Sequence, residues 1–212
     1  MRPYFEKDGI TLYHGDCREI LPTLCKVDLV LTDPPYGLNW QGGTWGADPK
    51  YRDAARWDVL VDPVLLAAVI AAGESAIVWG GNHYSLPPCR GLLAWQKTNA
   101  VPTMADFELA WTTFDRPAKA WISSNNCSKG NSHPTQKPVP LMQWCIEQAR
   151  RERELRVVLD PFSGSGSTLV AAKLCGLEAV GIEIEERYCA LAAERLSQKV
   201  IQWDAPREAV SQ

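Results

Sequence analysis

The chain has 212 residues, of which 46% are hydrophobic and 22% are charged, and its formal net charge is −3. This composition excludes wholesale disorder and a polycationic chain, and the length fits one domain. No apolar run is as long as a transmembrane helix, which needs about 18 residues. Residues 1–6 lack the apolar segment of a signal peptide, so we expect a cytoplasmic protein.

Strand and helix patterns alternate along most of the chain. The expected strands are 11–14, 27–32, 76–79, 92–96, 107–112, 155–160 and 179–184. The expected helices are 62–72, 139–151, 166–175 and 185–198, with 37–58 and 123–138 as long loops and 204–212 as a frayed tail. Such alternation predicts an α/β protein with a mainly parallel sheet.

The strand near residue 157 leads into a glycine turn. Gly164 and Gly166 allow a sharp turn and a close approach to a ligand, at the start of a helix whose N–H groups are free. No Gly-Lys-Ser/Thr follows, so this is not a phosphate loop, and the dinucleotide pattern is incomplete. Glu183 ends the next strand, 23 residues after Asp160, where a carboxylate can bind a ribose diol or stabilise a helix N-terminus.

A second cluster, Asp33-Pro34-Pro35-Tyr36, follows the strand 27–32. The prolines fix the backbone and remove two N–H donors. An acid, a fixed carbonyl and an aromatic ring at this edge of the sheet suit a planar substrate with an amino group: Tyr36 can stack on it, while Asp33 and the Pro34 carbonyl accept its N–H bonds. A structural turn is the alternative.

The distribution of charge and the cysteine content do not by themselves indicate one function. Residues 84–140 carry 6 basic and 3 acidic side chains together with Trp95, Trp111 and Trp121. This surplus fits either nucleic-acid contact or a solvated face. The seven cysteines form no Cys-x-x-Cys pair, so we expect reduced thiols and no metal site.

Taken together, the motifs resemble the β class of S-adenosylmethionine-dependent DNA amino-methyltransferases (adenine-N6 and cytosine-N4 enzymes). Four segments match in order: 13–17, 33–36, 133–138 and 160–166. The resemblance covers roughly residues 4–200. It implies a Rossmann-like, mainly parallel seven-stranded sheet with helices on both faces and a circularly permuted motif order. It also implies S-adenosyl-L-methionine as cofactor and double-stranded DNA as partner.

The resemblance assigns roles to matching residues. Those implied in the catalytic pocket are Asp33, Pro34, Pro35 and Tyr36. Asp16 matches the acid that binds the cofactor adenine, and Glu183 matches the acid that binds the ribose. In the family, the loop that matches Asp160 to Gly166 lies against the methionine, and the positions that match Thr135 and Lys137 lie near its carboxylate. The full implied cofactor set is Asp16, Cys17, Thr135, Lys137, Asp160, Pro161, Phe162, Gly164, Gly166, Thr168 and Glu183.

One departure from the family concerns target recognition. Within a single catalytic domain, 1–203, only about residues 97–132 remain for the recognition region, so we expect a short or relaxed target sequence, or a homodimer that pools two surfaces. The loop 37–58 can add DNA contacts or fill the core, through Trp40, Trp45, Arg52, Arg56 and Trp57.

In this family an aspartate at the first motif position usually accompanies adenine-N6 methylation, so adenine is favoured. Cytosine-N4 transfer, RNA methylation and a catalytically silent partner subunit are alternatives. Glutamine methyltransferases differ in the motif residue and the motif order, and a nicotinamide-dependent oxidoreductase would need the complete glycine pattern. The family fits a bacterial or phage origin; a cognate restriction nuclease is not evident from the sequence.

Overall fold

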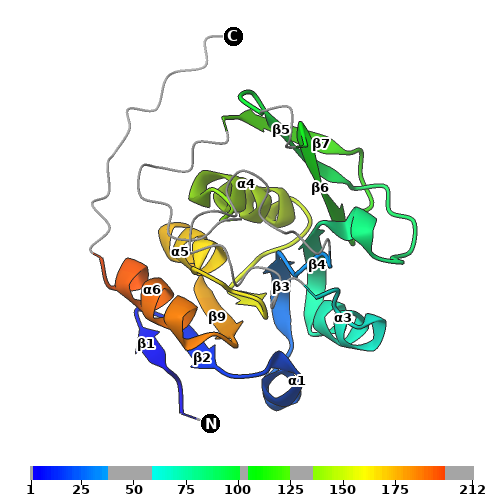
Figure 1. The fold of residues 1–212 in the computed structure, drawn as a ribbon. Helices are drawn as coiled ribbons and strands as arrows, with labels where there is room; N and C mark the ends of the chain where they lie inside the picture. Colours follow the sequence, from blue (N-terminus) through cyan, green and yellow to red (C-terminus); the bar gives the residue numbers. More distant parts are fainter. Residues whose placement is uncertain (1, 38–58, 101–104, 125–135, 199–212) are drawn as a thin grey trace, which may run out of the picture.

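The computed structural model describes residues 2–37, 59–100, 105–124 and 136–198. Nine strands in this part of the chain form one sheet (Figure 1). They are β1 (Phe5–Lys7), β2 (Ile10–His14), β3 (Val27–Thr32), β4 (Gly73–Trp79), β5 (Leu93–Lys97), β6 (Phe107–Thr112), β7 (Lys119–Ser123), β8 (Val157–Asp160) and β9 (Glu178–Glu183). Their order across the sheet is β1-β2-β9-β8-β3-β4-β6-β5-β7.

The middle of the sheet is parallel. Strands β2, β9, β8, β3 and β4 run in the same direction, and β6 lies antiparallel to both β4 and β5. The mainly parallel α/β prediction is confirmed, but the sheet has nine strands rather than seven. The two additional strands are the edges: β1 pairs antiparallel with β2, and β7 pairs parallel with β5. Both are short and mostly exposed, so neither has the apolar pattern by which a buried strand is predicted.

Helices cover both faces of the sheet, as expected (Figure 1). They are α1 (Cys17–Ile20), α3 (Pro63–Ala71), α4 (Val139–Arg150), α5 (Ser167–Leu174) and α6 (Glu186–Ser197), with 3-10 turns η1 (Leu21–Thr23) and η4 (Gly81–His83). Helices α4, α5 and α6 pack on one face, while α1 and α3 pack on the other. Strand residues alternate between the two cores: Leu29 and Leu31 belong to the first, and Val30 to the second.

The start of helix α3 is capped as predicted from the sequence. Asp62 caps the helix by accepting bonds from the N–H groups of Val64 (2.8 Å) and Leu65 (3.2 Å), and Pro63 occupies the first turn. The four-residue helix α1 is not predicted by the sequence pattern, because one turn is too short to show an apolar period. Within the described residues, no helix has both the length and the apolar character that crossing a bilayer requires.

Two strands fall in the segment 97–132, where the sequence predicts a reduced recognition region. Strand β6 is paired on both sides, so it is an inner strand of the sheet. Strand β7 takes up residues 119–123. The loop residues expected to contact DNA (Trp40, Trp45, Arg52, Arg56 and Trp57) lie outside the described residues.

Candidate active site

The acidic residues singled out from the sequence meet at one edge of the sheet. Because β2, β9, β8 and β3 are parallel neighbours, their carboxyl ends share that edge. Asp160 and Glu183 end β8 and β9, Asp33 directly follows β3, and Asp16 lies two residues beyond β2. This edge is where open α/β sheets bind ligands.

The motif that follows β3 is held by hydrogen bonds between side chains. The hydroxyl of Tyr36 donates to Asp33 Oδ1, and the Lys137 ammonium donates to Asp33 Oδ2 at 2.6 Å. The hydroxyl of Tyr84 donates to the Pro35 carbonyl, which fixes the turn from the other side. Burial raises the pKa of Asp33 above its ordinary value, and the neighbouring Lys137 opposes that rise.

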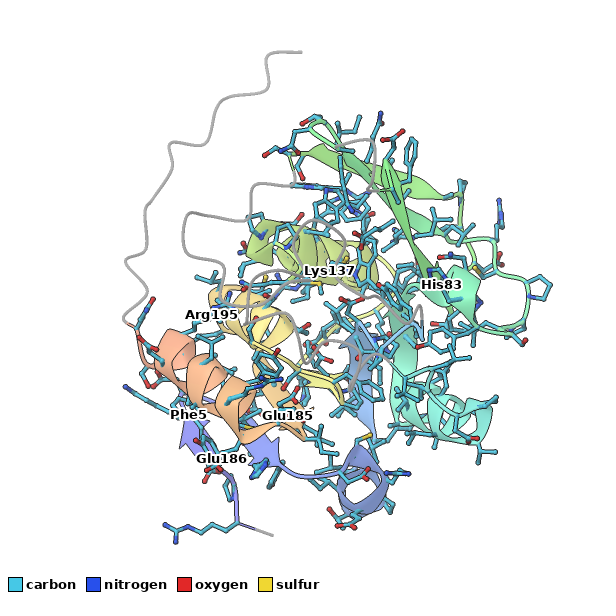
Figure 2. The ribbon with its side chains drawn as sticks, viewed as in Figure 1. Phe5, His83, Lys137, Glu185, Glu186 and Arg195 are labelled. Atoms are coloured by element: carbon cyan, nitrogen blue, oxygen red, sulfur yellow. The ribbon has the colours of Figure 1, made fainter. Side chains whose placement is uncertain are left out.

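The ring of Tyr36 is positioned by close neighbours. It stacks on His83, with 4.9 Å between ring centroids and an interplanar angle of 22°, and Figure 2 labels His83 and Lys137 on the ribbon. The Lys137 ammonium lies 5.5 Å from the Tyr36 centroid. Gly80, with φ +67°, lies so close that a Cβ there would overlap the ring. Only glycine leaves room for the ring at this place.

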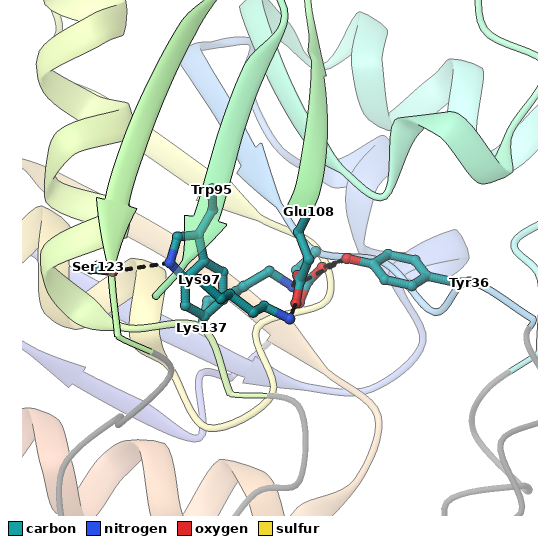
Figure 3. A network of polar contacts seen from close by, with 7 residues as sticks. Tyr36, Trp95, Lys97, Glu108, Ser123 and Lys137 are labelled. Carbon is teal, nitrogen blue, oxygen red and sulfur yellow. Dashed lines mark hydrogen bonds and ion pairs between the residues drawn. The ribbon is translucent and has the colours of Figure 1, made fainter. Parts of the chain in front are cut away.

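Asp33 belongs to an ionic cluster with Lys137, Glu108 and Lys97, and Figure 3 labels the last three. Lys137 Nζ is 2.9 Å from Glu108 Oε2 on β6, and Lys97 Nζ at the end of β5 is 2.5 Å from Glu108 Oε1. The side chains of Lys97 and Lys137 are only 6% and 5% exposed. Two ammonium groups and two carboxylates therefore balance one another, with the lysines enclosed and the side chains of Asp33 and Glu108 20% and 23% exposed.

The cluster changes the pKa of its members in opposite directions. Burial would raise the pKa of Glu108, but the ammonium groups of Lys137 and Lys97 outweigh it and lower the pKa to about 2. Burial would also disfavour the charge of Lys137, yet the carboxylates of Asp33 and Glu108 raise the pKa of this lysine well above its usual value. Glu108 is therefore ionised and Lys137 protonated at neutral pH.

The glycine loop after β8 is fastened to the end of β9. Glu183 accepts bonds from the N–H of Gly164 (2.7 Å) and the N–H of Glu185 (2.8 Å), and burial raises its pKa. Gly166 has φ +78°, and a Cβ there would lie 2.9 Å from the Cβ of Ala192 on α6. The hydroxyl of Ser163 is buried and has no hydrogen-bond partner among the described residues. The loop thus combines the Ser163 hydroxyl, which has no partner among the described residues, with the hydrogen-bonded carboxylate of Glu183.

Hydrogen bonds to the Asp160 side chain fix the start of this loop. It accepts bonds from the Thr32 hydroxyl (2.7 Å) and from the N–H of Phe162 (3.2 Å), and burial raises its pKa to about 6. The side chain of Thr168 on α5 also bonds to Asp160. Pro161 and Phe162 continue from it into the turn, and the Phe162 ring packs against the second core.

The remaining predicted cofactor residues lie near β2 or beyond the described part. Asp16 caps α1 through the N–H of Arg18 (2.9 Å) and forms an ion pair with the Arg18 guanidinium, which lowers the pKa of Asp16. The Cys17 side chain belongs to the second core, and burial raises its pKa to about 11. Thr135 lies outside the described residues. Lys137 contacts Asp33 and Glu108, and its role towards the methionine carboxylate stays a prediction.

Several residues of the site were not found from the sequence. Lys97 and Glu108 come from strands that the sequence did predict, and a single carboxylate within the apolar strand 107–112 was the available signal. Gly80 and His83 follow β4 at the same edge of the sheet, and the pair of glycines after that strand could have indicated a close contact.

The groups at the strand ends suit the parts of S-adenosyl-L-methionine. Across β2, β9, β8 and β3 the edge presents Asp16, Glu183, the glycine loop and Asp33. The cofactor consists of an adenine, a ribose, the methyl-bearing sulfonium and the amino-acid end of methionine. Carboxylates suit the adenine amino group and the ribose hydroxyls, while backbone N–H groups and a free hydroxyl suit the amino acid end. The residues present therefore fit this cofactor.

Comparison with known proteins agrees with the fold. A family model described as DNA methylase (N6_N4_Mtase) matches residues 95–194. The protein YubD of Escherichia coli (strain K12), named as a methylase, is 31% identical over 211 residues that cover 86% of this chain and 88% of YubD. The type II methyltransferase M2.LlaDCHI of Lactococcus lactis subsp. cremoris is 25% identical over 92% of each chain.

Solved structures show the same fold at lower identity. The cytosine-N4-specific PvuII DNA methyltransferase is 18% identical, has a TM-score of 0.65, and the match covers 94% of this chain and 90% of that one. A complex of M1.HpyAVI with S-adenosylmethionine is 22% identical, with a TM-score of 0.54 over 88% of this chain and 99% of that one.

The chain thus has the α/β fold of known DNA methyltransferases, with an acidic cluster and a glycine loop at one edge of the sheet. The chain belongs to the N6/N4 DNA methylase family, and it is an S-adenosyl-L-methionine-dependent DNA methyltransferase.

Proposed function

We propose that the protein transfers the methyl group of S-adenosyl-L-methionine to the exocyclic N6 amino group of an adenine in double-stranded DNA. The observation that carries this proposal is the placement of Asp33, bonded to Tyr36, next to the glycine loop along the edge of the sheet. An aspartate at this motif position is what the resemblance associates with adenine.

The chemistry follows from the weakness of the nucleophile. An exocyclic amine donates its lone pair into the ring, so it attacks poorly unless its nitrogen becomes pyramidal. Asp33 and the Pro34 carbonyl would accept the two N–H bonds and direct the lone pair at the methyl group, while the Tyr36 ring stacks on the base. When bound, the cofactor supplies a methyl group on a good leaving group, so orientation provides much of the rate. Asp33 would accept the released proton.

The substrate base has to leave the duplex before it can reach this edge. Base flipping costs a few kcal/mol, part of which stacking on Tyr36 returns. The whole segment 97–132 is short, and strands β6 and β7 lie within it, so little chain is available for reading sequence. We therefore propose a short or relaxed target sequence, with a homodimer as the way to enlarge the contact surface.

The cofactor contacts are proposed residue by residue. Asp16 would bind the adenine amino group and Glu183 the ribose hydroxyls, with the loop from Asp160 to Gly166 against the methionine. Thr135 and Lys137 would face its carboxylate, as the resemblance implies. Residues 1–203 would form one catalytic domain. The relatives are bacterial proteins, which supports action on DNA in a bacterial cytoplasm, and a cognate nuclease is a further proposal that only the type II names of the relatives support.

The test is the transfer of labelled methyl groups from S-adenosyl-L-methionine to unmethylated double-stranded DNA, followed by nucleoside mass analysis. We expect N6-methyladenine at many sites with a short common sequence. N4-methylcytosine would reverse the base assignment but keep the mechanism. Binding of the cofactor with no label in DNA would contradict the proposal and favour RNA methylation or a silent partner subunit.

A further inference from the structure

The Lys137 ammonium occupies the place that the proposed mechanism reserves for the amino group of the target base. It donates to Asp33 Oδ2 at 2.6 Å and contacts the Tyr36 hydroxyl at 3.1 Å. An ammonium and an exocyclic amine are both N–H donors of similar reach. The target amino group and the Lys137 ammonium therefore compete for the same carboxylate oxygen of Asp33.

Releasing a buried cation normally carries a large penalty, because an unpaired charge cannot remain in a dry pocket. Lys137 has a second carboxylate within reach, since Glu108 Oε2 lies 2.9 Å from its nitrogen. Glu108 is held by Lys97 through its other oxygen at 2.5 Å. The ammonium can thus leave Asp33 and stay paired.

We propose that Glu108 is a positioning residue for methyl transfer: it holds Lys137 when the target amino group replaces that ammonium on Asp33. This inference rests on the proposed function, but it applies equally to an adenine or a cytosine amino group. Glu108 itself touches neither the base nor the methyl group; it acts through Lys137.

The charges around Asp33 also predict that removing Glu108 and removing Lys137 change the pH dependence of the rate in opposite directions. The groups that face Asp33 are Tyr36 from its own turn, Lys137 from the segment before α4, Glu108 from β6, and Asp160 at the end of β8. The negative Glu108 raises the pKa of Asp33, and the positive Lys137 lowers it. Removing one or the other should therefore move the acidic limb of the rate profile in opposite directions.

The experiment compares Glu108→Gln with the wild type in the methyl-transfer assay, using Lys137→Met as the opposing variant and Glu108→Asp as the conservative one. Glu74→Gln is the matched control, because Glu74 forms a 3.0 Å pair with Lys26 at the surface. Kinetics are recorded from pH 5 to 9, and cofactor affinity is measured by calorimetry.

For Glu108→Gln we expect kcat/KM for DNA to fall by roughly 100-fold at neutral pH, as for a misplaced reacting group. The acidic limb should move to lower pH, and cofactor affinity should stay within about twofold. In Lys137→Met the acidic limb should move to higher pH, Glu108→Asp should recover part of the rate, and Glu74→Gln should behave as wild type.

Unchanged kcat/KM and an unchanged limb in Glu108→Gln would overturn the inference. An equal loss of transfer, cofactor binding and thermal stability in this variant would also overturn it, since that indicates a structural role. A wild-type protein that transfers no label to DNA would instead overturn the proposed function, and the inference with it.

Discussion

The hydroxyl of Thr32 donates a 2.7 Å hydrogen bond to Asp160, 128 residues later in the chain. This bond joins the end of β3, from which Asp33 follows, to the end of β8, from which the glycine loop follows. The proposed methyl acceptor site and the proposed methionine site are thus tied together by one buried contact. The contact adds to the backbone pairing of β3 with β8 and joins motifs that lie far apart in the chain.

The burial of Asp160 predicts a pH-dependent stability. Its pKa is about 6 in the folded state against an ordinary value of 3.8, so the folded state holds the proton more tightly. The cost of ionising it is absent below about pH 4 and complete above about pH 6, where it amounts to about 3 kcal/mol. Asp160→Asn avoids this cost.

We therefore expect the melting temperature of Asp160→Asn to rise relative to wild type as the pH increases from 4 to 7. Thermal unfolding in a pH series measures this difference. Thr32→Val, which removes the 2.7 Å bond and keeps the carboxyl group, should lower stability without removing the pH trend. A difference between Asp160→Asn and wild type that does not vary with pH would refute the argument.

Asp33 is expected to be essential for transfer and dispensable for cofactor binding. Asp33→Ala removes the acceptor of the target amino group, and it leaves Lys137 paired with Glu108. The transfer of labelled methyl groups should fall below detection, while calorimetry should show a cofactor affinity close to that of wild type. Asp115→Ala, at an exposed acid paired with Arg90, is the control. Retained turnover in Asp33→Ala would remove Asp33 from the mechanism.

The contact between Gly80 and Tyr36 offers a geometric test. In Gly80→Ala the new Cβ would overlap the ring, which would have to move away from Asp33 and His83. We expect transfer to fall by roughly 100-fold, as for a displaced reacting group, with cofactor affinity unchanged.

Gly176→Ala provides the matched control. Gly176 has a similar φ of +69°, and a Cβ at this position would have no neighbour within 4 Å. The variant should therefore show only the about 1 kcal/mol strain of a left-handed residue. Equal activity losses in Gly80→Ala and Gly176→Ala would mean that backbone strain, and not the Tyr36 ring, is responsible.

Glu183 is expected to govern cofactor affinity. Its carboxylate holds the N–H groups of Gly164 and Glu185, and its remaining lone pairs are proposed to accept from the ribose. Glu183→Gln keeps the shape but loses the charge, so calorimetry should show an affinity for S-adenosyl-L-methionine lower by about tenfold or more. The exposed Glu186, labelled in Figure 2, offers Glu186→Gln as the control. An unchanged affinity in Glu183→Gln would exclude the ribose role.

The sequence alone predicted the inner strands of the sheet, most of the helices and the acids at the strand ends. Apolar runs such as 27–32, helix signals such as Asp62-Pro63 and the glycine turn at Gly164 are local patterns, and they depend on a few consecutive residues. The four ordered motifs then indicated the family. None of these features needs knowledge of contacts between distant segments.

Only the tertiary structure placed Lys97, Glu108 and Lys137 around Asp33, and only it set Gly80 and His83 against Tyr36. These contacts join β5, β6, the residue after β4 and the segment before α4. Their pairing depends on the insertion of β6 between β4 and β5, which no short window of sequence specifies. Single charged residues look alike in sequence. Whether one is solvated or buried beside a counter-charge is decided by which strands become neighbours.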